Sequence, residues 1–518
     1  MNQEPKDTIG GGYARYVLGV LVVVYIFNFL DRQILSILAT RIKADLGVTD
    51  AQLGFLYATA FAVFFALFGL PLGRLADVWN RTRLIALGLA FWSLMTAVSG
   101  FAANFTQLAL ARVGVGVGEA SASPAAYSLL SDYFPRRLRA TVMAIYSGGI
   151  YLGTGLGLAI GGLVVDRWDT AFAAGGAPLG LKGWQAAFLV VGVPGLLLAI
   201  LASTLKEPVR GISDGLLSAE EPHPWRAFAH ELCAVIPPLT LWNLHRLGAT
   251  GKAVAANLAA GLGASALAWL ATRALGNPAQ WISVAVGVYA AVSWAQSLAL
   301  RDRPSAALIF RTPSMVYAVL GFSFLSFNGY GYGFWLASFF ARVHEVPLQK
   351  VGLLVGGAAA AGGWLGVTLG GVLADRWRRT SPNGRLYVGM LNAVLPVPLS
   401  LFMLWTPSAS LALAVAVPVY LVGALWLGPG ISTVQDLVLP RMRAVASAAF
   451  LLVNTLIGLA MGPYVVGRLS VATGDLRVAL SFSLIASGIA LTFFLIAART
   501  LARDEDSKLE RARAAGEG

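Results

Sequence analysis

Long apolar stretches of about 20 residues recur along nearly the whole 518-residue chain, with short polar segments between them. A helix of that length crosses a hydrocarbon core of about 30 Å, and a bundle of helices satisfies its backbone hydrogen bonds internally. The pattern predicts fourteen membrane-spanning helices. They are expected at 15–40, 51–72, 84–104, 107–131, 139–165, 184–205, 253–275, 279–300, 313–341, 347–374, 385–405, 409–435, 443–467 and 476–499.

Composition agrees with this pattern, since 57% of the residues are hydrophobic and only 12% are charged. Such a chain has too little polar surface to cover a water-soluble globule. The first span follows a polar start and is longer than the apolar core of a signal peptide, so we expect it to be retained. The predicted fold class is therefore an all-α polytopic membrane protein.

The net charge of +13 reflects an excess of Lys and Arg, which accumulate on cytoplasmic loops of membrane proteins. With both termini in the cytoplasm, about 27 of the 38 Lys and Arg fall on the cytoplasmic side and about nine outside. This distribution predicts a multi-pass protein of the bacterial inner membrane with both ends in the cytoplasm. It accounts for the positive charge without a nucleic-acid partner.

Metal, cofactor and nucleotide chemistry find little support in the sequence. Cys233 is the single cysteine, and none of the four His residues falls inside a predicted span, so neither a disulfide framework nor a metal cluster is expected. The stretch from Gly175 to Lys182 lacks the spacing of a phosphate-binding loop. We therefore expect no cofactor and no metal, and neither an enzyme nor an ATP-driven pump.

The chain contains an internal repeat. The segment GRLADVWNR at 73–81 recurs as GVLADRWRR at 371–379, the segment at 132–140 is echoed at 436–444, and GLAIG at 157–161 is echoed at 458–462. Three echoes in the same order indicate duplication, and parallel halves of this kind are one way to build a secondary transporter. The charged and glycine positions of these loops are expected to gate the cytoplasmic side: Gly73, Asp77, Arg81, Arg139, Gly371, Asp375, Arg379 and Arg443.

These repeated loops resemble the signature of the major facilitator superfamily, which has a Gly followed by Leu-Ala-Asp and several basic residues. The resemblance implies two pseudo-symmetric six-helix bundles, at 1–205 and 311–500. The segment 206–310 would then be a cytoplasmic linker with two additional transmembrane helices, and 501–518 a solvated cytoplasmic tail. The glycine-dense stretches 148–162 and 352–371 are expected to bring helices close together rather than to bind substrate.

Four charged residues lie well inside the predicted spans: Asp31, Arg32, Arg112 and Glu119. Charges within a membrane are rare and are functional candidates by default. Burial raises the pKa of a carboxyl group and a nearby Arg lowers it, so an Arg that moves between carboxylates can couple proton uptake to a change of shape. The alternatives are a static Arg112–Glu119 pair that only fixes helix packing and, for Arg32, either a salt bridge or an extension toward the membrane surface.

Uncharged polar positions complete the predicted substrate site. Arg112, Gly116, Glu119 and Ser123 share one helix face, because their spacing is three or four residues, and this face is expected to line a central cavity. The stretch 328–335 alternates glycines with aromatic residues, a composition able to break a helix. The candidates there and in a late span are Asn328, Tyr330, Tyr332, Trp335 and Asn454, with aromatic packing and helix hydrogen bonding as their alternatives.

A finer resemblance is to the Spinster branch of this superfamily. It is carried by NFLDR at 28–32, by ARVGVGVGEAS at 111–121 followed by Pro124, and by DYFP at 132–135. It implies a proton-linked carrier of amphipathic lipids such as lysophospholipids or sphingoid phosphates, with Asp31 as the proton site and Arg112 and Glu119 in the coupling network. Expected partners are a membrane lipid or other amphipathic substrate and protons, and a monomer is expected; a proton-driven multidrug or organic-anion exporter is the alternative.

Overall fold

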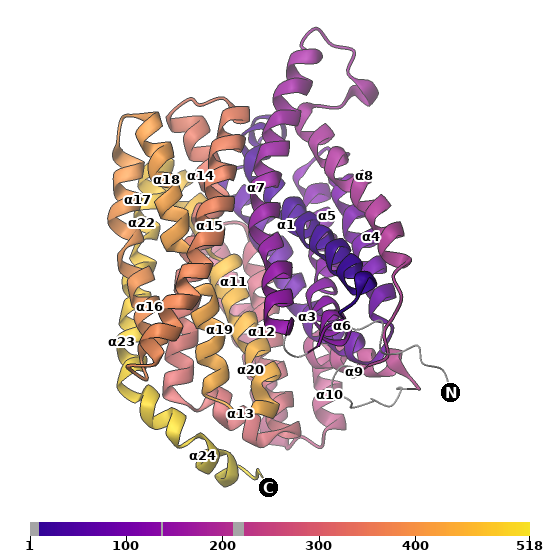
Figure 1. Cartoon of the computed structure of the whole chain (residues 1–518), viewed down its shortest axis with the longest axis vertical. Coiled ribbons are helices and arrows are strands. Elements are labelled where there is room, and N and C mark those ends of the chain that lie inside the picture. The colour runs from indigo at the N-terminus through magenta and orange to yellow at the C-terminus, as the bar shows by residue number, and fades with distance from the viewer. Residues whose placement is uncertain (1–9, 136–137, 211–221, 518) are drawn as a thin grey trace. The chain divides into compact units, whose positions relative to one another are not determined.

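The computed structural model describes residues 10–135, 138–210 and 222–517, and within these ranges every regular element is a helix (Figure 1). Twelve of the described helices are long and apolar enough to cross a membrane. A thirteenth span results if α13 (Arg303–Phe310) and α14 (Pro313–Val343), which are bent by 61° relative to each other, are counted together. The prediction of an all-α polytopic membrane protein is confirmed. The basic pair Arg136 and Arg137 of the repeated loop lies outside the described residues.

The predicted span 107–131 differs from the structure, where it is divided into α5 (Phe105–Glu119) and α6 (Ala122–Tyr133). Two residues at the break explain it. The Ser121 hydroxyl donates to the carbonyl of Gly118 at 2.9 Å and so competes with the helical hydrogen bonds. Pro124 has no N–H to donate to the carbonyl of Ala120.

Internal contacts divide the chain into two compact units. Unit 1 consists of Met1–Gly47, Leu67–Leu232 and Pro347–Gly356, and unit 2 consists of Val48–Ala66, Cys233–Val346 and Gly357–Gly518. The units thus differ from a simple division into sequence halves, because α3 (Ala60–Val78) and α15 (Leu348–Arg378) each contribute to both.

Unit 1 is a bundle of closely packed helices (Figure 1). Small residues allow the close packing: a side chain at Gly153 of α7 would lie 2.4 Å from the carbonyl of Ile26 in α1, and one at Gly192 of α8 would lie 2.6 Å from the backbone of Ala97 in α4. The packing role predicted for 148–162 is thereby confirmed. Besides α5, α6 and the later part of α3, the elements are α1 (Gly12–Leu46), α4 (Arg81–Ser99), α7 (Arg139–Ala171), η3 (Pro178–Gly180), α8 (Gly183–Ser203), most of α9 (Pro224–Val235) and the start of α15.

Unit 2 contains the remaining helices, and glycines again permit close packing. In α15 a side chain at Gly366 or Gly370 would collide with the carbonyl of Leu421 or Leu425, which confirms the packing role predicted for 352–371. Besides α13, α14 and the rest of α15, the elements are α2 (Asp50–Gly54), η1 (Phe55–Thr59), the start of α3, α10 (Leu239–Arg246), α11 (Gly251–Leu275), α12 (Pro278–Arg301), α16 (Gly384–Val394), α17 (Pro396–Trp405), α18 (Ala409–Gly423), α19 (Leu427–Asp436), η5 (Pro440–Met442), α20 (Arg443–Asn454), η6 (Thr455–Leu459), α21 (Gly462–Thr473), α22 (Leu476–Ser483), α23 (Ile485–Asp506) and α24 (Lys508–Ala514).

Two π-helical turns, η1 and η6, meet inside unit 2. The Thr59 hydroxyl at the end of η1 donates to the carbonyl of Ala460, next to η6, at 2.6 Å. A π-turn interrupts the regular hydrogen-bond pattern of a helix, and such turns are frequent at functional sites. Here a hydroxyl from one turn satisfies a backbone acceptor beside the other.

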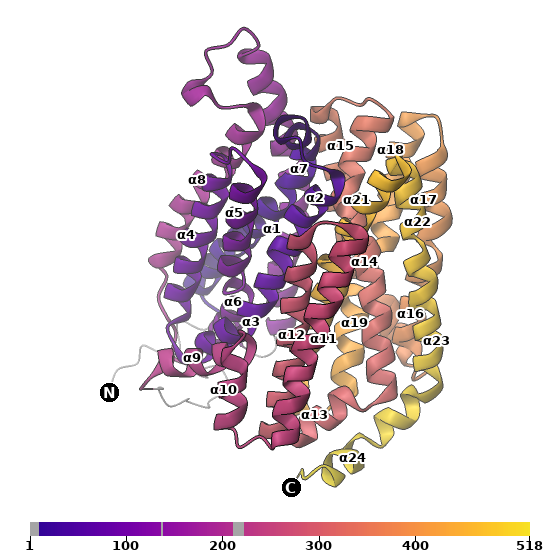
Figure 2. The same cartoon turned by 180° about the vertical axis from the view of Figure 1, so that it is seen from behind.

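The two additional helices predicted in the central segment are α11 and α12, which form a hairpin (Figure 2). The Tyr289 hydroxyl donates to Asn257 Oδ1 at 2.7 Å, and Asn257 Nδ2 donates to Ser293 at 2.9 Å. The hairpin also contacts both π-turns through α12. A side chain at Gly287 of α12 would lie 2.7 Å from Leu456 in η6 and 3.4 Å from Val63 in α3. The insert is therefore packed within unit 2 beside the two turns.

The C-terminal segment is helical and docked, in contrast to the predicted solvated tail. Asp504 is buried at the end of α23 and accepts a hydrogen bond from the Ser314 N–H of α14 at 3.1 Å. Ala512 of α24 is fully buried as well. The charged residues at helical spacing thus present one face to unit 2 and one face to solvent.

Candidate functional site

The four intramembrane charges predicted from the sequence all lie in unit 1, where α1 and α5 bring them together. Asp31, Arg112 and Glu119 are at most 1% exposed, and Arg32 is 6% exposed. Arg32 Nη2 donates to Glu119 Oε2 at 2.7 Å, and its guanidinium also lies over the Phe29 ring. Arg32 is therefore the ion-pair partner of Glu119, and the alternative in which it extends toward the membrane surface is wrong.

Arg112 is oriented toward the backbone of α1. Its Nη1 donates to the main-chain carbonyl of Asp31 at a long distance of 3.4 Å. The guanidinium thus lies next to Asp31, and this contact is made to the main-chain carbonyl rather than to the carboxylate. A small rotation of the Arg112 side chain is enough to change its distance from the carboxylate.

The Asp31 carboxyl group is the most unusual member of the cluster. It is fully buried, and among the described residues neither of its oxygens has a hydrogen-bond partner. The groups that face it are the Thr96 hydroxyl and the Trp92 indole of α4, together with the charged side chains of Glu119 and Arg112. A buried carboxylate normally has donors, because an unpaired one is costly, so this arrangement requires a functional explanation.

Ser123 is separated from its predicted helix face by the break between α5 and α6. It lies instead beside the phenols of Tyr25 and Tyr146, whose rings stack at a centroid distance of 4.3 Å. The face formed by Arg112, Gly116 and Glu119 in α5 is buried, as expected for a spacing of three and four residues.

The predicted polar positions of unit 2 fall on regular helix. The stretch 328–335 does not break: α14 runs without interruption from Pro313 to Val343, so the prediction of a broken helix there is wrong. A helix buried among neighbours tolerates glycine, because its backbone hydrogen bonds are protected from competition.

Several of these side chains have structural contacts within unit 2. Asn328 Nδ2 donates to Ser487 at 2.8 Å, Tyr332 to the carbonyl of Leu480 at 3.3 Å, and Trp335 Nε1 to the carbonyl of Pro463 at 2.7 Å. Tyr330 is half-buried. Asn454 is buried directly before η6, and in the described part of the chain its Oδ1 has no hydrogen-bond partner.

The first signature loop contains a buried ion-pair network. Arg81 is 1% exposed and donates to Asp132 at 2.5 Å and to Glu207 at 2.7 Å. Arg210 donates to the carbonyl of Ala76 at 2.9 Å and to those of Asp77 and Trp79. Burial, and to a lesser degree the neighbouring Arg81, lowers the pKa of Arg210.

In the second signature loop the equivalent of Arg81 is Arg385, not the predicted Arg379. Arg385 donates to Asp436, and the same sequence offset separates Arg81 from Arg385 as separates Asp132 from Asp436. Arg379, Asp375 and Arg443 are exposed, and within the described ranges none of them forms an ion pair.

Among the remaining gating candidates, Asp77 is exposed and Gly73 is half-buried, with its nearest neighbour, Pro124, at ordinary contact distance. Gly371 has open space beside it. Arg139 Nε donates to the carbonyl of Ser131 at 3.2 Å. Of the predicted gating residues, Arg81 alone among the described residues is a fully buried cation.

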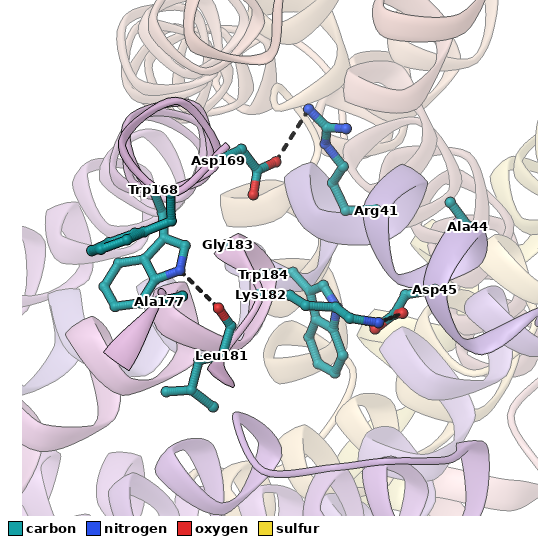
Figure 3. Close-up of a pocket in the computed structure, with 11 residues that line it drawn as sticks. Arg41, Ala44, Asp45, Trp168, Asp169, Ala177, Leu181, Lys182, Gly183 and Trp184 are labelled. Carbon is teal, nitrogen blue, oxygen red and sulfur yellow. Dashed lines mark hydrogen bonds and ion pairs between the residues drawn. The ribbon is translucent and has the colours of Figure 1, made fainter. Parts of the chain in front are cut away.

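A pocket that the sequence did not indicate lies in unit 1 between the ends of α1, α7 and α8 (Figure 3). Its volume is about 460 Å³. Arg41 pairs with Asp169 at 3.3 Å on one side, and Asp45 accepts hydrogen bonds from Lys182 and from the Trp184 indole on the other (Figure 3). Arg41 is about 15 Å from Asp31 along α1, so this pocket is separate from the charge cluster.

Comparisons with known proteins relate the whole chain to a transporter family. The family model of the Major Facilitator Superfamily matches residues 21–463. The chain is 27% identical over 477 residues to an MFS-type efflux pump of Mycolicibacterium smegmatis, covering 92% of this chain and 89% of that protein. It is 26% identical over 494 residues to protein spinster homolog 1 of Homo sapiens, covering 90% of this chain and 76% of that protein.

Among solved structures, the chain is similar to a bacterial homolog of the human lysosomal transporter Spinster in an inward-facing and occupied conformation. The TM-score is 0.71 at 24% identity, with 95% of this chain and 98% of that chain covered. This likeness supports the fold, and the predicted Spinster branch is represented among both kinds of relative. The chain is therefore a membrane transporter that belongs to the Major Facilitator Superfamily.

Proposed function

We propose that this transporter moves amphipathic lipids of the lysophospholipid or sphingoid-phosphate type, coupled to protons, by alternating access. It would act as a monomer in a bacterial inner membrane, with both termini in the cytoplasm. The orientation rests on the distribution of Lys and Arg, and the lipid class rests on the Spinster resemblance.

Proton coupling is supported by one observation above all: Asp31 is fully buried, and within the part of the chain that is described its carboxyl oxygens have no hydrogen-bond partner. A carboxyl group held away from water responds strongly to any nearby change of charge. Arg112 lies beside it on the carbonyl of the same residue, and Glu119 faces it while paired with Arg32. A small displacement of α1 relative to α5 would change these interactions and drive proton uptake or release.

The same cluster offers a counter-charge for an acidic headgroup. Arg112 is the cation expected to attract a phosphate, because a guanidinium matches phosphate oxygens in two-point contacts. Ser123, Asn328, Tyr330, Tyr332, Trp335 and Asn454 remain candidates for contacts to the substrate, with roles that follow from the resemblance and from their polarity in apolar spans.

A second candidate function is a proton-driven multidrug or organic-anion exporter. The observation that favours it is the full-length similarity to a protein named as an efflux pump. Such an exporter would use the same fold and the same buried charges, and only the substrate would differ.

The test is transport by purified protein in liposomes, with and without a pH gradient, comparing a fluorescent lysophospholipid, a sphingoid phosphate and a cationic dye. We expect gradient-driven lipid movement in the wild type and its loss in Asp31→Asn, which keeps the shape of the side chain but cannot ionise. Dye movement without lipid movement would favour the exporter. An undiminished gradient response in Asp31→Asn would remove Asp31 as the coupling residue.

A further inference from the structure

We infer that Trp92 and Thr96 of α4 are the hydrogen-bond partners that Asp31 engages when it loses its proton, so that α4 sets the pH at which the carrier exchanges protons. This inference rests on the proposed proton coupling at Asp31. It assigns a positioning role to two uncharged residues in a helix that carries none of the four intramembrane charges.

The geometry is a set of unpaired polar groups that face one another. The Trp92 indole and the Thr96 hydroxyl face the Asp31 carboxyl group from α4. All three side chains are buried, with Asp31, Trp92 and Thr96 each 0% exposed. In the described ranges Asp31 Oδ1 and Oδ2, Trp92 Nε1 and Thr96 Oγ1 all lack a hydrogen-bond partner. Donors and acceptors that are each unpaired, and that lie opposite one another, are positioned to bond after a small shift.

The position of α4 is fixed by its neighbours, so the donors Trp92 and Thr96 are held in place. Trp92 and Thr96 are one helical turn apart and therefore share a face. A side chain at Gly118 of α5 would lie 2.8 Å from Trp92 Cβ, and one at Gly195 of α8 would lie 2.2 Å from the Ser93 hydroxyl. Because α4 is held this closely by α5 and α8, Trp92 and Thr96 are fixed in position opposite the Asp31 carboxyl group.

The two side chains differ in what they can offer. An indole N–H only donates, so Trp92 bonds a carboxylate more strongly than a carboxylic acid and cannot accept the O–H of the acid. A hydroxyl both donates and accepts, so Thr96 can bond Asp31 in either protonation state. Trp92 therefore favours the charged form, whereas Thr96 can bond either form of the carboxyl group once the two approach.

The charged groups that face Asp31 are Glu119, which disfavours its negative charge, and Arg112, which favours it. Arg32 is engaged by Glu119 at 2.7 Å. Because the two charged neighbours oppose each other, neutral donors at close range can decide when the proton leaves.

The experiment measures gradient-driven lysophospholipid transport in liposomes as a function of pH, for the wild type, Trp92→Phe, Thr96→Val and Thr96→Ser. Loss of a donor to the carboxylate makes the proton harder to release, so the pH of half-maximal rate should move upward by about one unit in Trp92→Phe and Thr96→Val. Thr96→Ser should restore the wild-type profile. Ser99→Ala is the matched control on α4, because the Ser99 hydroxyl bonds its own helix at the carbonyl of Met95, and it should leave the profile in place.

A second readout keeps the test independent of transport rate. The infrared band of the protonated carboxyl group, identified by its absence in Asp31→Asn, should titrate at higher pH in Trp92→Phe and Thr96→Val than in the wild type. If both variants lower the rate equally at every pH, with an unmoved band, these residues only pack and the inference is overturned. If Asp31→Asn keeps the gradient dependence of the wild type, the proposed proton coupling at Asp31 fails. The two failures are therefore distinguished by different variants.

Discussion

The interiors of the two units carry different kinds of polarity. Unit 1 encloses an ion pair, Arg32–Glu119, and an unpaired carboxyl group at Asp31. The predicted polar sites of unit 2 are neutral amide, phenol and indole groups such as Asn328, whose amide donates to Ser487. Buried carboxylates of unit 2 have partners: Asp50 accepts from Arg342 and from Ser470, each at 2.8 Å, and Asp504 accepts from the Ser314 N–H. The two units therefore differ at their candidate sites: the carboxyl group of Asp31 can respond to protons, while the neutral groups at the predicted sites of unit 2 have contacts that pH does not alter.

The repeated loops show the same divergence at a smaller scale. Both retain an Arg–Asp pair, but the Arg81 side chain is 1% exposed, whereas that of Arg385 is 18% exposed. Arg81 also binds Glu207, which belongs to the segment after α8. The shared pair reflects the duplication, and the deeper network is specific to unit 1.

The largest effect is expected when one partner of the buried ion pair in unit 1 is removed. Glu119→Gln leaves the Arg32 guanidinium buried without its counter-charge, and we expect it to lower the free energy of unfolding by about 3 to 5 kcal/mol. The double variant Arg32→Gln, Glu119→Gln removes both charges and should recover a large part of that loss. Unfolding in mixed micelles, followed by tryptophan fluorescence, gives both values.

The same variants separate a static pair from a working one. A static pair predicts that the double variant regains transport along with stability. A coupling role predicts that stability returns while gradient-driven transport stays below one tenth of the wild-type rate. Recovery of both would place Arg32 and Glu119 outside the coupling network.

The two loop pairs provide the next largest effect. Arg81→Gln removes the buried cation that Asp132 and Glu207 share, and we expect a loss of about 3 kcal/mol in unfolding free energy. Arg385→Gln removes a more exposed pair and should cost about 1 kcal/mol. Added salt should reduce the loss of unfolding free energy in Arg385→Gln more than in Arg81→Gln, because salt screens exposed charges more than buried ones. Equal losses at the two sites would show that burial does not distinguish the loops.

The residues of the charge cluster could be predicted from the sequence, because a charge inside an apolar span stands out. Their pairing could not. Arg32 follows Asp31 directly and faces another direction on α1, and the choice of Glu119 as its partner depends on how α1 is rotated against α5. Trp92 and Thr96 could not be predicted for the opposite reason, because neutral residues are ordinary in such a span. Among the described residues, only the lack of hydrogen-bond partners for their polar atoms distinguishes them.

The register of the second signature loop and the positions of helix breaks could not be predicted from the sequence either. Counting from Gly371 leads to Arg379, but the second loop is longer, and Arg385 occupies the equivalent site just after the start of α16. Asn80 and Asn383 immediately precede α4 and α16, and aligning the loops on these helix starts brings Arg385 within one residue of the position of Arg81. At 328–335 glycine content suggested a break, yet the helix persists, whereas the break at Ser121 followed from a local hydroxyl bond and Pro124.

The packing of unit 2 can be tested at the contact between the α11–α12 hairpin and the π-turns. Gly287→Leu places a branched side chain where the first added carbon already lies 2.7 Å from Leu456, and we expect overpacking to cost about 2 kcal/mol. Gly263→Leu is the matched control, since Gly263 of α11 faces open space and a leucine there should not lower stability. The measurements are the unfolding free energy and the transport rate. Equal effects of the two substitutions would mean that the hairpin does not pack tightly on the turns.

The smallest effect is expected at the bond that joins the two turns. Thr59→Val keeps the shape of the side chain but removes the hydroxyl that donates to the carbonyl of Ala460 at 2.6 Å, so that carbonyl loses a buried donor. We expect a loss of about 1 kcal/mol in unfolding free energy, recovered in Thr59→Ser. Thr154→Val is the control, because the Thr154 hydroxyl bonds only the carbonyl of Ile150 in its own helix, α7. Because neither the Thr59 hydroxyl nor its acceptor carries a charge, the pH dependence of transport should stay that of the wild type in Thr59→Val. A shifted profile would mean that unit 2 takes part in proton coupling and would end the distinction between the two units.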